Sequence, residues 1–229
     1  MNRMKQSPFN QLKIKQSLKI ITFGLKKYPR KIAIAWSGGL DSMVLLHLTR
    51  SVIGDKGYLP VLFIDSGYEP KETYELLQKL IKYWQLSVIR ITDKFTLRQI
   101  RKMKSKTKRK GLMMKMKIRA LKKAIKEYRL KAIFAGIRWE EQEAYQSEVY
   151  VSPRKNHIRF YPLLHFTRKD ILSYIKQFDI PHRPQDGWEI QSPRQPSLMQ
   201  RILRRETLIQ PKQKAREKVS QRLRIKGYF

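Results

Sequence analysis

The sequence predicts an α/β protein with a doubly wound parallel sheet, helices on both faces of that sheet and a basic C-terminal extension. Three observations predict this class. Short apolar segments rich in β-branched residues alternate along the chain with longer segments of helical periodicity. The apolar segments are nearly continuous, as is typical of parallel strands buried on both faces. Glycine, proline and serine separate the segments, and right-handed crossovers would join successive parallel strands.

The first elements are the clearest. Apolar residues at helical spacing among lysines predict a leading amphipathic helix over residues 9–27, which Tyr28-Pro29-Arg30 ends. The run Lys31-Ile32-Ala33-Ile34-Ala35-Trp36 then predicts a buried strand that stops at Ser-Gly-Gly. Helical periodicity returns from Asp41 to Arg50.

The alternation continues through the middle of the chain. We expect strands at 59–65, 86–91 and 131–136, and helices at 72–84 and 112–128. Pro70 marks the start of the helix at 72–84. The helix at 112–128 is long and basic.

After residue 150 the pattern is weaker. A short strand is expected within 158–163, and Thr167 is a good N-cap for a helix that ends near Phe178. Residues 181–197 contain four prolines and predict an extended edge or linker segment, followed by a polar, basic tail. We therefore divide the chain into a leading helix (1–30), an α/β domain (31–180) and a Pro-rich segment with a basic tail (181–229).

Composition limits the functions that are possible. The formal net charge of +33 predicts a polyanionic partner, with RNA or DNA first and an acidic membrane surface second. A merely solvated basic surface is the alternative. The chain has no cysteine, which excludes disulfides, thiolate zinc sites, iron–sulfur clusters and a cysteine-based sulfur relay within it. No apolar run reaches membrane-spanning length and no signal-peptide pattern begins the chain, so a soluble, cytoplasmic protein is expected.

The loop after the first strand carries the chemistry. It reads Ser37-Gly38-Gly39-Leu40-Asp41-Ser42. Glycines let backbone N–H groups approach an anion, and the helix that follows adds the partial positive charge of its N-terminus. The two serines supply hydroxyls for phosphate oxygens or for the helix cap. Asp41 would repel phosphate unless it holds Mg²⁺ or the substrate, so the loop predicts a metal-bridged nucleotide. It lacks the Walker ending and the third glycine of the dinucleotide fingerprint.

This loop resembles the SGGxDS signature of the PP-loop ATP pyrophosphatases. Three later segments resemble the phosphoadenylyl-sulfate (PAPS) reductase and sulfate adenylyltransferase small-subunit branch: Phe63 to Tyr68 with Glu69-Pro70, Lys117 to Leu121, and Phe134 to Arg138 with its following acids. The likeness covers about residues 20–190. It implies a Rossmann-like (HUP-type) fold and binding of ATP, or a related adenine nucleotide, with Mg²⁺.

The resemblance also implies roles for particular residues. Ser37 to Ser42 and Gly136 would hold the nucleotide phosphates, and Asp41 would hold the metal. Asp65 would lie near the ribose and adenine, unless it only caps the turn at Gly67. Lys117 and Arg138 would act with Asp41 on the phosphate or sulfonate groups. The alternative for Glu140 and Glu141 is that they only orient Arg138. Arg154 and Arg159 are weaker candidates for the same anion.

The chain departs from that branch at its cysteines. The reductases use a cysteine near the C-terminus, and thiouridine-forming relatives commonly use cysteines or a cluster, so neither chemistry is expected here. Sulfate activation needs no cysteine, but it does not explain the charge.

Two basic segments extend beyond the family pattern, residues 94–110 and the tail after Pro193. Lysine and arginine in such runs contact phosphate backbones without sequence choice. The nucleic-acid-binding candidates are Arg101, Lys102, Lys104, Lys106, Lys108, Arg109, Lys110, Arg204 and Arg205.

Together these features favour an enzyme that adenylates an RNA and releases pyrophosphate. The RNA would be tRNA, which the resemblance implies as the usual substrate of the superfamily, or rRNA. The first alternative is a sulfate- or sulfonucleotide-activating enzyme with a protein partner. The second is a catalytically degenerate member that serves as an RNA- or ribosome-binding protein.

Overall fold

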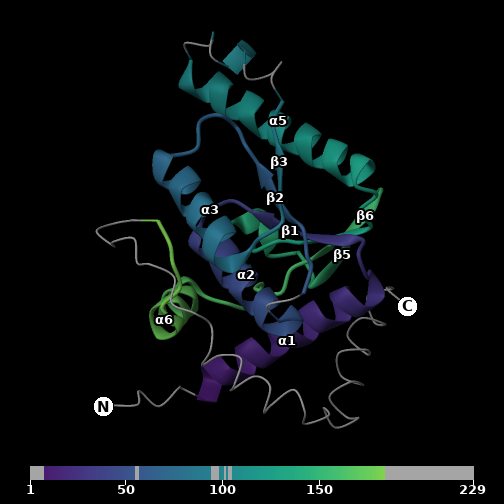
Figure 1. Ribbon diagram of the computed structural model, residues 1–229, viewed down its shortest axis with the longest axis vertical. Helices are drawn as coiled ribbons and strands as arrows, with labels where there is room; N and C mark the ends of the chain where they lie inside the picture. Colours follow the sequence, from purple (N-terminus) through teal and green to yellow (C-terminus); the bar gives the residue numbers. More distant parts are fainter. Residues whose placement is uncertain (1–7, 55–56, 94–97, 101, 103–104, 184–229) are drawn as a thin grey trace. The chain divides into compact units, whose positions relative to one another are not determined.

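The computed structural model describes residues 8–54, 57–93, 98–100, 102 and 105–183. In this part of the chain six strands form one sheet of order β3-β2-β1-β4-β6-β5 (Figure 1). The strands are β1 (Ile32–Trp36), β2 (Val61–Ile64), β3 (Val88–Ile91), β4 (Ala132–Phe134), β5 (Val151–Arg154) and β6 (His157–Phe160). Neighbours pair in parallel except β5 and β6, which are antiparallel. The predicted doubly wound α/β fold is confirmed, and its direction of winding reverses between β1 and β4.

Helices cover both faces of this sheet. They are α1 (Pro8–Lys27), α2 (Leu40–Ile53), α3 (Lys71–Trp84), α5 (Lys106–Glu127) and α6 (Arg168–Phe178). Helix α2 packs against β1, α1 and α6 on one face, whereas α5 packs against β2 and β3 (Figure 1). Since β1–α2–β2 and β2–α3–β3 progress in the same direction, right-handed crossovers place α3 on the α2 face and α5 on the opposite one.

Small residues let α5 lie close to the sheet. Ala33 of β1 and Leu62 of β2 form a buried cluster with Ala120, Ala124 and Ile125 of α5. In β1, residues 33 and 35 are alanines that belong to or pack against this cluster, while the buried isoleucines alternate with them. That alternation follows from the two-residue period of a strand.

Apart from shifts of one to three residues at other ends, three features differ from the sequence prediction. Strand β5 was not predicted, because Ser152 and Pro153 break its apolar pattern, which an edge strand tolerates. Strand β6 ends at Phe160, before the proline at position 162. Helix α5 begins at Lys106, so residues 106–110 are helical and not part of a connecting segment. Lysine and arginine are good helix formers, and apolar periodicity alone did not reveal this first turn and a half.

The leading helix α1 packs onto the α/β body. Ile14, Ile20 and Ile21 are buried, and the Ser17 hydroxyl donates to the Pro162 carbonyl at 2.7 Å. Lys13 forms an ion pair with Asp170. Asp170 also completes the capping box of α6, in which Thr167 accepts from its backbone N–H, so the predicted N-cap is confirmed. No helix of the described ranges combines the length and apolarity needed to cross a bilayer.

A buried histidine makes the fold sensitive to pH. His47 lies in the middle of α2, with Nδ1 3.0 Å from the Tyr174 hydroxyl oxygen and its ring against Trp84 and Phe178. Burial, and secondly the charge of Arg50, lowers the pKa of His47 from 6.5 to about 4. Because the folded pKa is depressed, the neutral ring stabilises the fold above pH 6.5, and this contribution is lost as the pH falls toward 4.

We therefore expect the free energy of unfolding to fall on acidification from about pH 7 to pH 4.5, with about 2–3 kcal/mol of that fall due to His47. Urea titrations at both pH values measure it. In His47→Gln, which cannot gain a proton, the fall should be smaller by that amount. An equal fall in both proteins would assign the effect to other groups.

Candidate functional site

The loop between β1 and α2 has a backbone that only glycine adopts easily. Gly38 has a φ of +77°, and a Cβ there would lie 2.9 Å from the Thr73 Cγ2 atom. Gly39 is the N-cap of α2 and offers no side-chain cap. Gly39 therefore leaves the first amides of this 14-residue helix without a cap from its own side chain, and uncapped amides at a helix N-terminus commonly bind an anion.

The two serines of the loop have different surroundings. The buried Ser42 hydroxyl donates to the Gly39 carbonyl at 2.7 Å and lies 3.4 Å from the Ser37 hydroxyl. Ser37 is exposed, and its oxygen accepts from the Gly39 N–H at 3.4 Å. Ser42 therefore holds the loop in shape, whereas Ser37 is accessible to a ligand. Leu40 is buried beneath the loop.

The reversal of winding between β1 and β4 brings the next residues to this loop. Gly136 follows β4, and a Cβ there would lie 3.0 Å from the Asp41 carbonyl oxygen, which explains the need for glycine. Arg138 is buried, with 6% of its side chain exposed, and forms ion pairs with Asp41 and Glu140. Glu140 also accepts the N–H of Arg168. The charge of Arg138 is therefore compensated by two carboxylates.

Asp65 lies at the end of β2 in a second cluster. Its buried carboxylate accepts from the Gly67 N–H at 2.8 Å, from the Tyr74 hydroxyl at 2.7 Å and from Arg90 Nε at 2.9 Å. Burial alone would raise the pKa of Asp65, but these hydrogen bonds and the Arg90 charge outweigh it and hold the pKa below its usual value. Burial and the Asp65 carboxylate in turn raise the pKa of Tyr74 to about 12. Asp65 thus caps the turn at Gly67, and a role at the ribose stays a prediction.

Two of the remaining predicted anion contacts, Lys117 and Arg154, also meet carboxylates, whereas Arg159 donates to a histidine ring. Lys117 of α5 reaches Glu69 at 3.0 Å, and Glu69 accepts from the Ser66 hydroxyl at 2.7 Å. Arg154 pairs with Glu148 in the segment before β5. Arg159 Nε lies 3.2 Å from His157 Nε2 in the β5–β6 hairpin.

One residue at the loop was missed by the sequence reasoning. Arg183 donates from Nε to the Gly38 carbonyl at 3.0 Å and from Nη1 to the Thr73 hydroxyl at 3.1 Å. Both acceptors are neutral, so its charge is not balanced by either bond. The only signal in the sequence is an arginine between two prolines, Pro181 and Pro184, which does not distinguish it from many other cations.

The predicted nucleic-acid contacts are only partly within the described residues. Lys102 is exposed. The backbone of Lys106, Lys108, Arg109 and Lys110 forms the start of α5. Arg101, Lys104, Arg204 and Arg205 lie outside the described residues.

Comparison with known proteins identifies the family of this site. The model of the phosphoadenosine phosphosulfate reductase domain matches residues 31–184, which include the loop, Arg138 and Arg183. The chain belongs to the phosphoadenosine phosphosulfate reductase domain family. A relative within this family, the adenosine 5'-phosphosulfate reductase of Bacillus cereus strain 03BB102, is 30% identical over 177 residues, which cover 74% of each chain.

Solved structures share the fold of the family. The phosphoadenylyl-sulfate reductase of Candida auris, in a phosphate complex, matches with a TM-score of 0.60 and 16% identity over 79% of this chain and 91% of that one. The FMN adenylyltransferase of Candida glabrata in complex with ATP matches with a TM-score of 0.60 and 21% identity, over 80% of this chain and 60% of that one. The U34-tRNA thiolase NcsA of Methanococcus maripaludis, with its [4Fe-4S] cluster, matches with a TM-score of 0.56 and 15% identity, over 88% of this chain and 75% of that one. The family and these folds make the chain a PP-loop-type nucleotide-binding domain.

Proposed function

We propose that this chain binds ATP in the loop Ser37 to Ser42 and uses it to adenylate an RNA, releasing pyrophosphate. The observation that carries the proposal is the charge balance around the loop. Arg138, Lys117 and Arg90 each face a carboxylate, but the recorded bonds of Arg183 go to neutral acceptors beside the helix N-terminus. A guanidinium that meets no carboxylate among the described residues, next to helix amides without a side-chain cap, would suit a phosphate chain.

The Mg²⁺ expected with ATP fits the carboxylates at the loop. Magnesium in nucleotide sites is held by one or two carboxylates, with phosphates and water as its other ligands. Asp41 lies in the first turn of α2, and its charge, after burial, raises the pKa of the neighbouring Glu141. Asp41 would hold the ion, with Glu141 beside it. When bound, the ion would neutralise charge on the phosphates and favour departure of pyrophosphate.

The group that receives the adenylyl group, and the nucleophile that later displaces AMP, follow from the charge of the chain and from its lack of cysteine. A carbonyl oxygen of an RNA base would attack the α-phosphorus of ATP, forming an oxygen–phosphorus bond while the bond to the β-phosphate breaks. A nucleophile such as an amine would then displace AMP. A thiol of this chain cannot serve in this step, because the chain has none. The tRNA thiolase with the same fold supports an RNA substrate on this scaffold.

Sulfonucleotide chemistry is the second candidate, since the matched relatives include adenosine 5'-phosphosulfate reductase at 30% identity. Sulfate would then be the group that attacks the α-phosphorus. The net charge of +33 favours RNA over a small anion.

ATP–pyrophosphate exchange tests the proposal. We expect Mg²⁺-dependent exchange that increases when transfer RNA or ribosomal RNA is added. Stimulation by sulfate instead would overturn the RNA assignment and support sulfate activation. Salt-sensitive RNA binding without exchange under either condition would contradict an enzymatic role and favour an RNA- or ribosome-binding protein.

A further inference from the structure

The outer face of α5 carries a row of cations. Its exposed basic side chains are Lys115, Arg119, Lys122, Lys123 and Lys126, which we call the α5 basic face. Their spacing of three or four residues puts them on one side of the helix. Within the described residues, the recorded ion pair of this face joins Arg119 to Asp93 at 3.3 Å. The helix has one acidic residue, Glu127, at its end.

This row opposes helix stability. Like charges at i,i+3 and i,i+4 destabilise a helix by a few tenths of a kcal/mol per pair, about as much as opposite charges stabilise it. Helix α3 shows the ordinary pattern, with Lys71 paired to Glu75 at 3.2 Å. Folding alone therefore favours alternating signs on α5, and a polyanionic ligand would relieve the repulsion.

The position of the face favours a polynucleotide that leads to the nucleotide site. The middle of helix α5 lies at the carboxyl edge of the sheet, where Lys117 reaches Glu69 in the loop after β2. It then runs antiparallel to the strands, and Lys115 to Lys126 span about 16 Å at 1.5 Å per residue. A nucleic-acid strand that lies along this span would place several of its phosphates against the helix in succession. One end of a bound strand would lie beside the site.

Exposed apolar groups occur on the same helix. Met114 is 60% exposed and Ile118 48% exposed, and the Tyr128 ring just beyond the helix is 45% exposed. Such groups offer surface for bases, and an aromatic ring offers a stacking platform. They are too few to insert into a bilayer, because the main apolar side of α5, with Ala120 and Ala124, is buried against the sheet.

We propose that the α5 basic face is the docking surface for the phosphate backbone of the RNA, an inference that rests on the proposed RNA-adenylating function. It extends the candidates of the segment 94–110 along the helix. It also separates docking from chemistry: the face binds the backbone without sequence choice, while the loop at the carboxyl edge binds ATP.

The test replaces four lysines of the face by glutamine, Lys115, Lys122, Lys123 and Lys126, leaving Arg119 and Lys117 with their carboxylates. Binding of end-labelled total transfer RNA is measured by fluorescence anisotropy across a salt series, without ATP. Loss of four phosphate contacts should weaken binding roughly a hundredfold at about 100 mM salt and make the salt slope shallower by about 3.

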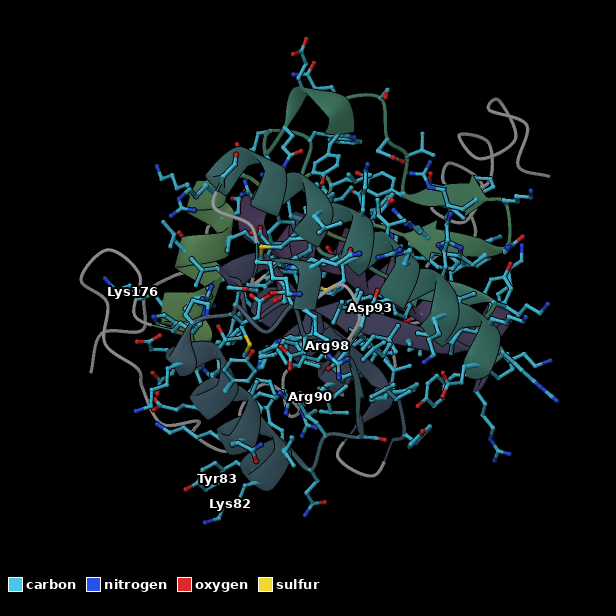
Figure 2. The ribbon with its side chains drawn as sticks, turned by 90° about the horizontal axis from the view of Figure 1, so that it is seen from above. Lys82, Tyr83, Arg90, Asp93, Arg98 and Lys176 are labelled. Atoms are coloured by element: carbon cyan, nitrogen blue, oxygen red, sulfur yellow. The ribbon has the colours of Figure 1, made fainter. Side chains whose placement is uncertain are left out.

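The control removes the same charge from the opposite side of the sheet, by glutamine at Lys19, Lys26, Lys82 and Lys176. Figure 2 shows Lys82 and Lys176 projecting outward from α3 and α6. Screening over about 10 Å should keep its affinity within about threefold of the unchanged protein. Circular dichroism and ATP binding should be unchanged in both variants.

Equal losses in the two variants, or none in the α5 variant, would overturn the inference. Binding to phosphatidylserine vesicles that requires the α5 lysines, with no RNA binding, would also overturn it, in favour of a membrane surface. The result is independent of ATP–pyrophosphate exchange. An inactive protein that still needs the face to bind RNA would contradict only the proposed adenylation, and an active one that does not need it would contradict only the docking surface.

Discussion

Asp41→Asn is expected to reduce RNA-stimulated ATP–pyrophosphate exchange by about a thousandfold, since a catalytic metal supplies several kcal/mol and each 1.36 kcal/mol is a factor of ten. The substitution keeps the shape of the side chain and a hydrogen-bond acceptor for Arg138. It removes the negative charge that would hold Mg²⁺ at the loop. RNA binding without ATP should be unaffected, because the α5 basic face is a separate surface.

Glu140→Gln is the matched control for this substitution. Glu140 faces the same buried guanidinium as Asp41, so both changes remove one negative charge from Arg138. Either change leaves the buried guanidinium with one carboxylate fewer. If Asp41 only compensates Arg138, the two variants should lose exchange to a similar degree. Exchange retained in Asp41→Asn at ordinary Mg²⁺ concentrations would show that this carboxylate does not hold the metal.

Arg183→Ala is expected to raise the Kd for ATP roughly a hundredfold, since hydrogen bonds to charged groups contribute about 1.5–3 kcal/mol. Arg183 Nε and Nη1 already donate to the Gly38 carbonyl and the Thr73 hydroxyl, which place the guanidinium at the loop. A guanidinium has five N–H donors, so these two bonds leave donors for a phosphate. Isothermal titration calorimetry with ATP and AMP measures the effect. AMP should lose less affinity than ATP if the contact is to the outer phosphates.

Two further variants separate direct contact from positioning. Arg183→Lys keeps the positive charge but loses the planar guanidinium with its paired N–H donors, and should recover part of the affinity for ATP. Thr73→Val removes one acceptor of Arg183 without touching a phosphate, and should change the Kd only a few-fold. An ATP affinity that is unchanged in Arg183→Ala would contradict the assignment of Arg183 to the nucleotide site.

The family of this chain and its lack of cysteine decide which reaction should be assayed in these variants. The matched relatives are named as reductases, yet this chain contains no thiol. Exchange of pyrophosphate, rather than reduction, is therefore the informative assay. Gly38 has a positive φ and lies against Thr73, so the loop has a backbone that suits glycine at this position.

Much of the fold and the central loop could be predicted from the sequence, because short-range chemistry determines them. The periodicity of apolar residues marks strands such as β1 and helices such as α2 wherever they occur. The positive φ of Gly38 is a property of its own backbone, and Thr167 caps a helix through the N–H of a residue three positions later. Strand β5 was missed for the same reason, since its pairing with β6 depends on an edge position that its own residues do not reveal.

The charge balance of the site required the tertiary structure. Asp41 and Arg138 are 97 residues apart in the sequence, and Gly38 and Arg183 are 145 apart. In a chain with 51 lysines and arginines, sequence cannot show which cations meet carboxylates and which do not. The reversal of strand order between β1 and β4 and the packing of α6 on α2 bring these residues together. Sequence therefore determined the fold class and the glycine-rich loop. Long-range packing determined that Arg138 meets two carboxylates and that Arg183, within the described part of the chain, bonds to neutral acceptors at the loop.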